Sequence, residues 1–321
     1  MKQRKFFLNP ATLAVAAVIG ICLASCKDSD KPYTVTDIDD EEWYVTSAGG
    51  FRFTYDEDGH LTSIIDRNGA YIVKDDEDKL VLDWNDFDET SHTEIVLNDD
   101  YNITKIVYSW TEDEDETGNE TYNFSYGSDK RLVSCTCTGR YAKRKRSENF
   151  TQTTSYGWSS NQMTIRQDEN WQRFDDGETD TESDKLSYVF TCAGQSNRCK
   201  QLPYYMGEEM ADTGELGGMF AVLGLLGYGP ENLPTGYTRE SVHNDNDSYE
   251  NNYALDFTLN SNGTISSERR GYRYFIGKYS YDDPFNYVYD AASRADAPAT
   301  QSFKEFVHNS LRKASLKHRG Q

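Results

Sequence analysis

The sequence predicts an all-β protein: a large antiparallel meander of hairpins, curved or closed into a barrel-like sheet, with one inserted apolar helix or loop and a C-terminal helix. Three observations support this fold class. Aromatic residues, which favour strands, make up 13% of the 321 residues, and Tyr (23) outnumbers Phe (15). Apolar and polar residues alternate with a period of two on both sides of several polar turns. The longest apolar run after the N-terminal segment has only twelve residues, 216–227, which is too short to span a membrane.

The N-terminal segment has the pattern of an export signal. The basic residues Lys2, Arg4 and Lys5 precede an apolar run from Ala11 to Leu23. The four residues 23–26, Leu-Ala-Ser-Cys, resemble the lipobox of bacterial lipoproteins. We therefore expect residues 1–25 to be removed and Cys26 to carry a diacylglycerol and a further acyl chain such as palmitate. Two or three acyl chains anchor a protein stably, here to the outer membrane.

Residues 26–45 form the expected acidic tether. Its first residues, Lys27-Asp28-Ser29-Asp30, resemble the acidic tag that directs lipoproteins of Bacteroides-type bacteria to the cell surface. Ser29 separates two acids that are adjacent in the usual tag. Both the periplasmic face and the cell surface therefore remain open as locations.

Residues 46–283 form the predicted hairpin meander. Four segments share a strand-like triplet, a polar turn, and one or two aliphatic positions at a constant spacing. Asn, Asp and Gly are expected to provide the positive-φ positions that such turns require. The triplets are Phe53-Thr54-Tyr55, Ile95-Val96-Leu97, Phe124-Ser125-Tyr126 and Phe257-Thr258-Leu259.

Two segments depart from the hairpin pattern. The run Leu216 to Gly227 is interpreted as a helix or loop that plugs the concave side of the sheet, with an exposed apolar lip as the alternative. Residues 284–321 are predicted to form a linker and a basic amphipathic helix, which Ser302 and Glu305 start as a capping box. That helix can rest on a membrane or an acidic partner, or dock on its own acidic domain, the reading we favour.

Four cysteines remain beside Cys26. An exported protein occupies a compartment that permits disulfides. Cys192 and Cys199 close a short loop and are predicted to form one. Cys135 and Cys137 would point to the same face of a strand, where a direct bond is strained, and whether they are bridged stays open. Without a neighbouring His in the sequence these cysteines do not indicate a metal, so no metal site is assigned.

The lipobox, the F-x-Y-turn-G-x-L hairpins and the segment Glu231-Asn232-Leu233-Pro234-Thr235 together resemble a known family. It consists of lipoprotein domains of unknown function with a porin-like β fold, found in gut Bacteroides-type bacteria. The resemblance covers about residues 46–283. It implies a barrel-like sheet and an envelope location, and it carries over no functional residue except Cys26.

Composition and motifs narrow the function. Asp and Glu (54) exceed Lys and Arg (33), which argues against a nucleic-acid partner. A membrane-spanning porin is disfavoured because the predicted strands are short and contain charged residues. The sequence lacks a nucleophile–base motif or a phosphate-binding loop, so no catalytic residue or cofactor is assigned.

We expect a non-enzymatic binding or scaffolding module, with a glycan or a protein as ligand. The alternative is a glycan-processing or other hydrolase that uses loop carboxylates. Oligomeric state remains open.

Overall fold

The computed structural model describes residues 36–38, 41–43, 45–56, 60–73, 79–86, 89–112, 115–144, 146–211, 213–243, 247–273, 279–288 and 302–318. Cys26 and the predicted signal segment lie outside these residues. The strands are β1 (Thr36–Ile38), β2 (Glu41–Trp43), β3 (Ser47–Ala48), β4 (Phe51–Tyr55), β5 (Leu61–Asp66), β6 (Gly69–Ile72), β7 (Lys79–Asn85), β8 (Glu89–Leu97), β9 (Ile103–Glu112), β10 (Glu116–Tyr126), β11 (Leu132–Lys143), β12 (Arg146–Trp158), β13 (Gln162–Asp175), β14 (Glu178–Thr191), β15 (Gly236–His243), β16 (Asp247–Leu259), β17 (Ile265–Arg273), β18 (Tyr279–Tyr281) and β19 (Phe285–Val288). The helices are α2 (Tyr204–Met210), α3 (Glu215–Val222) and α4 (Phe303–His318).

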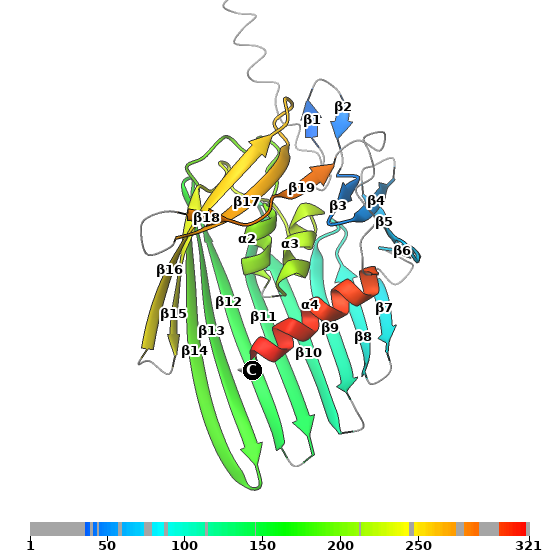
Figure 1. Ribbon diagram of the computed structural model, residues 1–321, viewed down its shortest axis with the longest axis vertical. Coiled ribbons are helices and arrows are strands. Elements are labelled where there is room, and N and C mark those ends of the chain that lie inside the picture. Colours follow the sequence, from blue (N-terminus) through cyan, green and yellow to red (C-terminus); the bar gives the residue numbers. More distant parts are fainter. Residues whose placement is uncertain are drawn as a thin grey trace, which may run out of the picture.

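Strands β3 to β19 are arranged around one barrel (Figure 1). The paired strands run antiparallel, and most pair with the next strand in the chain, while β14 pairs with β15 across the helical insertion. Strand β19 pairs with β3, so the two ends of the meander meet. Closure of this kind leaves fewer unpaired strand edges. The predicted all-β meander is therefore confirmed. The closing strand β19 lies in the segment that the sequence assigned to the linker.

The four predicted hairpins are present, and all four carry an irregularity at the same place. Each has a register shift next to its turn, as a β-bulge produces. The residue pairs that close the four turns are Tyr55↔Leu61, Leu97↔Ile103, Tyr126↔Leu132 and Leu259↔Ile265. The repeat seen in the sequence is therefore a repeat of one bulged hairpin.

The turn chemistry differs from the prediction. The equivalent left-handed positions are Tyr101 (φ 59°), Lys130 (φ 61°) and Gly263 (φ 90°). The expectation that Asn, Asp and Gly would occupy them is wrong at Tyr101 and Lys130. A non-glycine residue there costs roughly 1–2 kcal/mol. Contacts between neighbouring turns offset that cost: the Tyr101 ring stacks on His60 at 4.2 Å, and Nζ of Lys130 donates to Oδ1 of Asp100 at 3.1 Å.

The long strands bury one face and expose the other. On β12, Phe150, Gln152 and Tyr156 point into the barrel and are buried, whereas Thr151 and Thr153 are exposed on the outside. Strands β10 and β13 alternate in the same way. Transmembrane barrels show the opposite arrangement, with an apolar outer band and a polar interior. The core of this protein is therefore the interior of its barrel.

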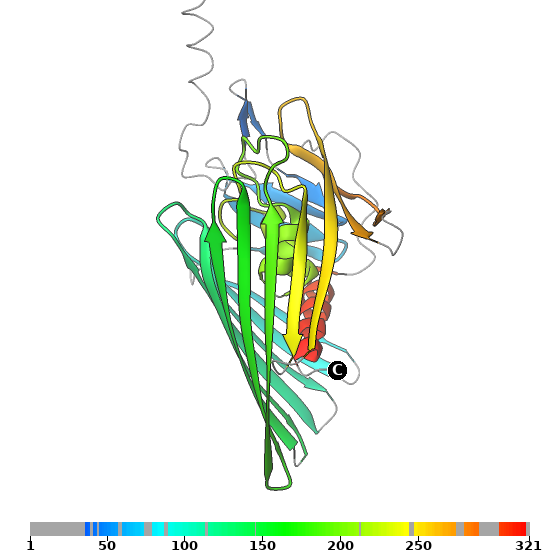
Figure 2. The same ribbon diagram turned by 90° about the vertical axis from the view of Figure 1, so that its left-hand side faces the viewer.

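The inserted apolar segment fills the upper part of the barrel. The chain between β14 and β15, which contains this segment, forms helices α2 and α3, and both lie inside the ring of strands in both views (Figures 1 and 2). Leu216, Phe220 and Leu223 are at most 1% exposed. A Cβ on Gly207 would lie 2.3 Å from Cβ of Ala221, so glycine permits the two helices to approach this closely. The prediction that residues 216–227 form a buried plug is confirmed, and the alternative of an exposed apolar lip is wrong.

Helix α4 lies below α2 and α3 against the inner face of the sheet (Figures 1 and 2). The predicted capping box is present: the Glu305 N–H donates to Oγ of Ser302 at 3.1 Å, and the Ser302 N–H donates to the Glu305 carboxylate at 3.3 Å. Phe303, Val307 and Leu311 are buried. The tail helix therefore docks on its own barrel, as favoured. Among the described residues, none of the helices is both long and apolar enough to cross a membrane.

Candidate functional site

A cleft of about 810 Å³ lies between the helices and the strands β15 and β17. Its volume is within the usual range for small-molecule sites. Phe306, Asn309 and Ser310 of α4 form one wall. The remaining wall and floor are strongly charged, with side chains of both signs. The charged lining residues are Glu208, Glu209, Glu215, Arg239, Arg270, Lys313 and Lys317.

Arg270 on β17 organises the floor of the cleft. Its Nη1 donates to Oε2 of Glu208 at 2.8 Å and lies 3.6 Å from Oε1 of Glu209. Its guanidinium also lies over the ring of Tyr205, 4.7 Å from the centroid. Burial raises the pKa of Glu208 to about 7, although the positive charge of Arg270 opposes the shift. The two adjacent acids of α2 therefore share one cation.

Arg239 on β15 offers a hydrogen bond to a ligand. Its guanidinium lies over the Tyr188 ring, 5.7 Å from the centroid. Its Nε is buried and has no hydrogen-bond partner within the described part of the chain. A buried donor without an acceptor costs about 1–3 kcal/mol. An acceptor that reached Nε would recover this cost.

The cleft also has a cationic side on α4. The Lys313 side chain is 82% exposed, and its Nζ lies 3.9 Å from Oε1 of Glu215. On the strand side, Tyr237 donates to Oε1 of Glu209 at 2.9 Å. The site therefore presents separated donors and acceptors beside a wall of one aromatic and two polar side chains, an arrangement that suits a polar ligand with many hydroxyl groups.

Glu268 holds α2 in place beneath the cleft. Its two carboxylate oxygens accept the N–H groups of Tyr204 at 2.5 Å and Tyr205 at 3.3 Å, and Tyr287 donates to it as well. These N–H groups belong to the first turn of α2, where they have no partner within the helix. Burial raises the pKa of Glu268 to about 7. Glu268 thereby positions Glu208 and Glu209.

The predicted cysteine pair does not belong to the cleft. The sulfur atoms of Cys192 and Cys199 are not bonded to each other in the structure, so the structure lacks the predicted disulfide. Backbone pairing holds this loop instead: Gly194 donates to Leu233 at 2.9 Å, and Leu233 donates to Gln195 at 2.8 Å. The bond itself stays a prediction.

A basic run in the sequence, Lys143-Arg144-Lys145-Arg146, connects β11 to β12, and its described residues pair with neighbouring acids. Lys143 lies 2.6 Å from Glu116, and Arg146 lies 2.6 Å from Glu148. The run is therefore part of the barrel's charge balance.

Sequence reasoning missed the charged residues of the cleft. Glu208 and Glu209 are two of 54 acidic residues, and nothing in their local sequence distinguishes them. The strand pattern assigns Arg239 and Arg270 to one face of the sheet, but it does not show which other elements pack against that face. Sequence reasoning also missed the buried histidines His308 and His318, which α4 carries into the barrel.

Fold and cleft together define a plugged antiparallel β-barrel with a charged cleft of ligand size. It is similar to two solved structures, both described as porin-like proteins. The one from Bacteroides vulgatus ATCC 8482 is 12% identical, with a TM-score of 0.46, and the match covers 77% of this chain and 99% of that one. The one from Bacteroides uniformis ATCC 8492 is 12% identical, with a TM-score of 0.28 and coverage of 66% and 95%. Neither similarity is close enough to transfer a function. No family model and no curated protein matches the chain.

Proposed function

We propose that this protein is a lipoprotein of the cell envelope whose barrel binds a glycan fragment in the cleft between α2, α4 and the strands β15 and β17, without catalysing a reaction. The observation that carries the proposal is the cleft itself, with Arg239 Nε directed to no acceptor among the described residues. An oligosaccharide that carries a carboxylate would supply that acceptor and meet Lys313 as well.

The proposed anchor is the lipid on Cys26, which holds the barrel at the outer membrane, on its periplasmic face or at the cell surface. Its support is the basic start, the apolar run and the lipobox of residues 23–26. Intact-mass measurement of protein purified from envelopes should show loss of residues 1–25 and the added mass of acyl chains. An unmodified Cys26, or cleavage elsewhere, would contradict the anchor.

A hydrolase is the second candidate, because Glu208 has a raised pKa of about 7 and Glu209 is beside it. The geometry argues against it. A glycosidase places its two carboxyl groups on either side of the scissile bond, roughly 5 to 9 Å apart. Here both carboxylates approach the same nitrogen of Arg270. A substrate could not lie between them without displacing that cation. The binding function is therefore preferred.

An oligosaccharide array tests the binding function with the full chain in detergent. It should contain neutral and uronate-bearing oligosaccharides. We expect binding of uronate-bearing members, weakened about 10- to 100-fold by Arg239→Gln, since a hydrogen bond to a charged group contributes about 1.5–3 kcal/mol. Arg166→Gln is the matched control, because Arg166 is exposed on β13 outside the cleft. Equal binding by Arg239→Gln and the parent, or no binding by the parent, would reject the proposal.

The same samples test the hydrolase. After incubation, mass spectrometry of the oligosaccharides should show unchanged chain lengths. Shorter products that disappear in Glu208→Gln would favour the hydrolase instead.

A further inference from the structure

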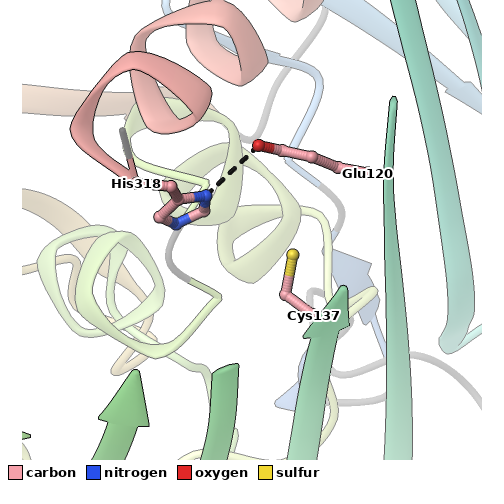
Figure 3. Close-up of side chains that lie close together, drawn as sticks. All are labelled: Glu120, Cys137 and His318. Carbon is pink, nitrogen blue, oxygen red and sulfur yellow. Dashed lines mark hydrogen bonds and ion pairs between the residues drawn. The ribbon is translucent and has the colours of Figure 1, made fainter. Parts of the chain in front are cut away.

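Three side chains with metal-binding atoms meet deep inside the barrel. They are Glu120 on β10, Cys137 on β11 and His318 at the end of α4 (Figure 3). Their ligand atoms all lie within 4.8 Å of one another, and each residue is at most 1% exposed. The cluster is separate from the ligand cleft, whose lining includes none of the three.

The strand register explains how two of them become neighbours. Tyr122 pairs with Cys137, and Glu120 pairs with Gly139, so Glu120 and Cys137 are diagonal neighbours on the inward face. Gly139 leaves room there: a Cβ at that position would lie 3.0 Å from the Tyr141 hydroxyl. The third residue arrives from the far end of the chain when α4 docks.

The surroundings hold each side chain in place. Nδ1 of His318 lies 3.2 Å from Oε1 of Glu120, and the imidazole stacks on Phe150 with centroids 4.3 Å apart. Glu120 also accepts hydrogen bonds from Tyr122, at 2.6 Å, and from Tyr141. Burial alone would raise the pKa of Glu120, yet these partners bring it below its usual value. Glu120 is therefore a carboxylate.

We propose that Glu120, Cys137 and His318 bind one zinc-like divalent metal ion that ties the C-terminal helix to the barrel wall. Thiolate, imidazole and carboxylate are the donor types that zinc takes in proteins. In a tetrahedral zinc site the ligand atoms are separated by roughly 3 to 4 Å. The most distant pair in the cluster, at up to 4.8 Å, therefore has to approach by roughly 1 to 2 Å when the ion binds.

The charges balance when the ion binds. Cys137 loses its thiol proton to solvent and binds as the thiolate, and a ring nitrogen of His318 binds as the neutral imidazole. One thiolate and one carboxylate then neutralise the dication, which leaves no net charge in a buried site. Water or the Tyr141 hydroxyl takes the fourth position. The hydrogen bonds that Tyr122 and Tyr141 donate to Glu120 orient the carboxylate, as partners of metal ligands commonly do.

Cobalt substitution tests the proposal directly. The full chain is refolded with Co²⁺, which shows a near-ultraviolet charge-transfer band when a thiolate is bound and visible bands when the geometry is tetrahedral. We expect both in the parent, displacement by one equivalent of Zn²⁺, and loss of the thiolate band in Cys137→Ser. His318→Gln should weaken Co²⁺ binding at least about tenfold.

Cys135→Ser is the matched control. Cys135 lies two residues earlier on the same strand, is also buried and inward-facing, and is not part of the cluster. It should keep both bands. A parent without a thiolate band, or a band that persists in Cys137→Ser, would overturn the metal site and leave a Glu120–His318 ion pair. If Cys137→Ser does not fold, the parent's own thiolate band and its loss on adding a chelator decide the question.

Discussion

The imidazole of His308 lies flat on the indole of Trp84, with ring centroids 3.9 Å apart and an interplanar angle of 8°. The residues belong to α4 and β7, so this stack joins the C-terminal helix to an early strand of the barrel. Nδ1 of His308 also lies 3.0 Å from Oγ of Ser91 and 3.2 Å from the Tyr108 hydroxyl. The tail helix is therefore fixed by rings and hydrogen bonds as well as by apolar contacts.

The first prediction concerns pH and His308. Burial, with the positive charge of Arg312, lowers its pKa to about 4. At a pH between about 4 and the ordinary His pKa of 6.5, the unfolded chain binds more protons than the folded protein does. Acidification through this range therefore lowers the free energy of unfolding. At about 1.36 kcal/mol per pKa unit, the loss reaches roughly 3 kcal/mol. Urea unfolding from pH 7.5 to 4 should show it.

His308→Phe keeps the stack on Trp84 and removes the titration. The parent should lose about 3 kcal/mol more stability than this variant on acidification. Glu89, whose raised pKa acts in the opposite direction, has a carboxylate oxygen 3.4 Å from Nε2 of His308, so both proteins are compared in a Glu89→Gln background. Parallel pH profiles would contradict the buried neutral histidine.

The second prediction has the opposite sign and concerns Glu268. Its pKa is about 7 in the folded protein, against an ordinary value of 4.5. The folded state holds more protons between these values, so stability is lost as the pH rises from about 4.5 through 7. As the pH rises through this range, the free energy of unfolding of the parent should fall by up to about 3 kcal/mol more than that of Glu268→Gln. Urea unfolding at pH 5 and pH 8 measures this. A variant whose stability changes with pH as the parent's does would show that Glu268 does not titrate there.

The third prediction separates docking from membrane binding by α4. Leu311 is fully buried, whereas the Lys313 side chain is 82% exposed. Leu311→Ala should lower the free energy of unfolding by about 2–5 kcal/mol. Lys313→Ala should change it by no more than about 0.5 kcal/mol. Chemical denaturation of the full chain in detergent measures both. Equal, small effects would mean that α4 is not part of the folded core.

The fourth prediction concerns the plug. Phe220 and Leu223 lie in and directly after α3 and are at most 1% exposed. Phe220→Asp and Leu223→Asp should each lower the melting temperature strongly, because an unpaired charge in an apolar core is costly. Ile72→Asp is the control, since Ile72 is 65% exposed. If the two plug variants melt like the control, the plug is not needed for folding.

The fifth prediction concerns the time at which the Cys192–Cys199 disulfide forms. Cys192 is buried, and burial raises its pKa to about 11, so the reactive thiolate is scarce once the protein has folded. Non-reducing peptide mapping should find the linked pair after oxidative refolding. It should find separate thiols when the same oxidant is added to reduced, folded protein. Recovery of both as thiols after oxidative refolding would refute the disulfide.

The local pattern of the sequence was enough for the elements. Alternation with a period of two and the constant spacing across four turns predicted the hairpins, because a strand buries every second residue whatever its partner. Ser302 and Glu305 marked the start of α4 for a similarly local reason. The apolar run 216–227 predicted a buried insert, since the rest of the chain after residue 25 has few aliphatic residues to fill a barrel.

Tertiary structure alone decided which distant side chains meet. Helix α4 brings His318 to Glu120 and Cys137, and the insertion brings Glu208 to Arg270. These pairs depend on how a closed sheet surrounds its plug, and no short-range spacing encodes that. The bulged turns make the same point, because Tyr101 and Lys130 adopt left-handed backbone where contacts between adjacent turns offset the cost. The sequence by itself determined the meander, its plug and its tail helix. The docking of α2, α3 and α4 against β15 and β17 determined the cleft, because it places residues from separate parts of the chain around one cavity.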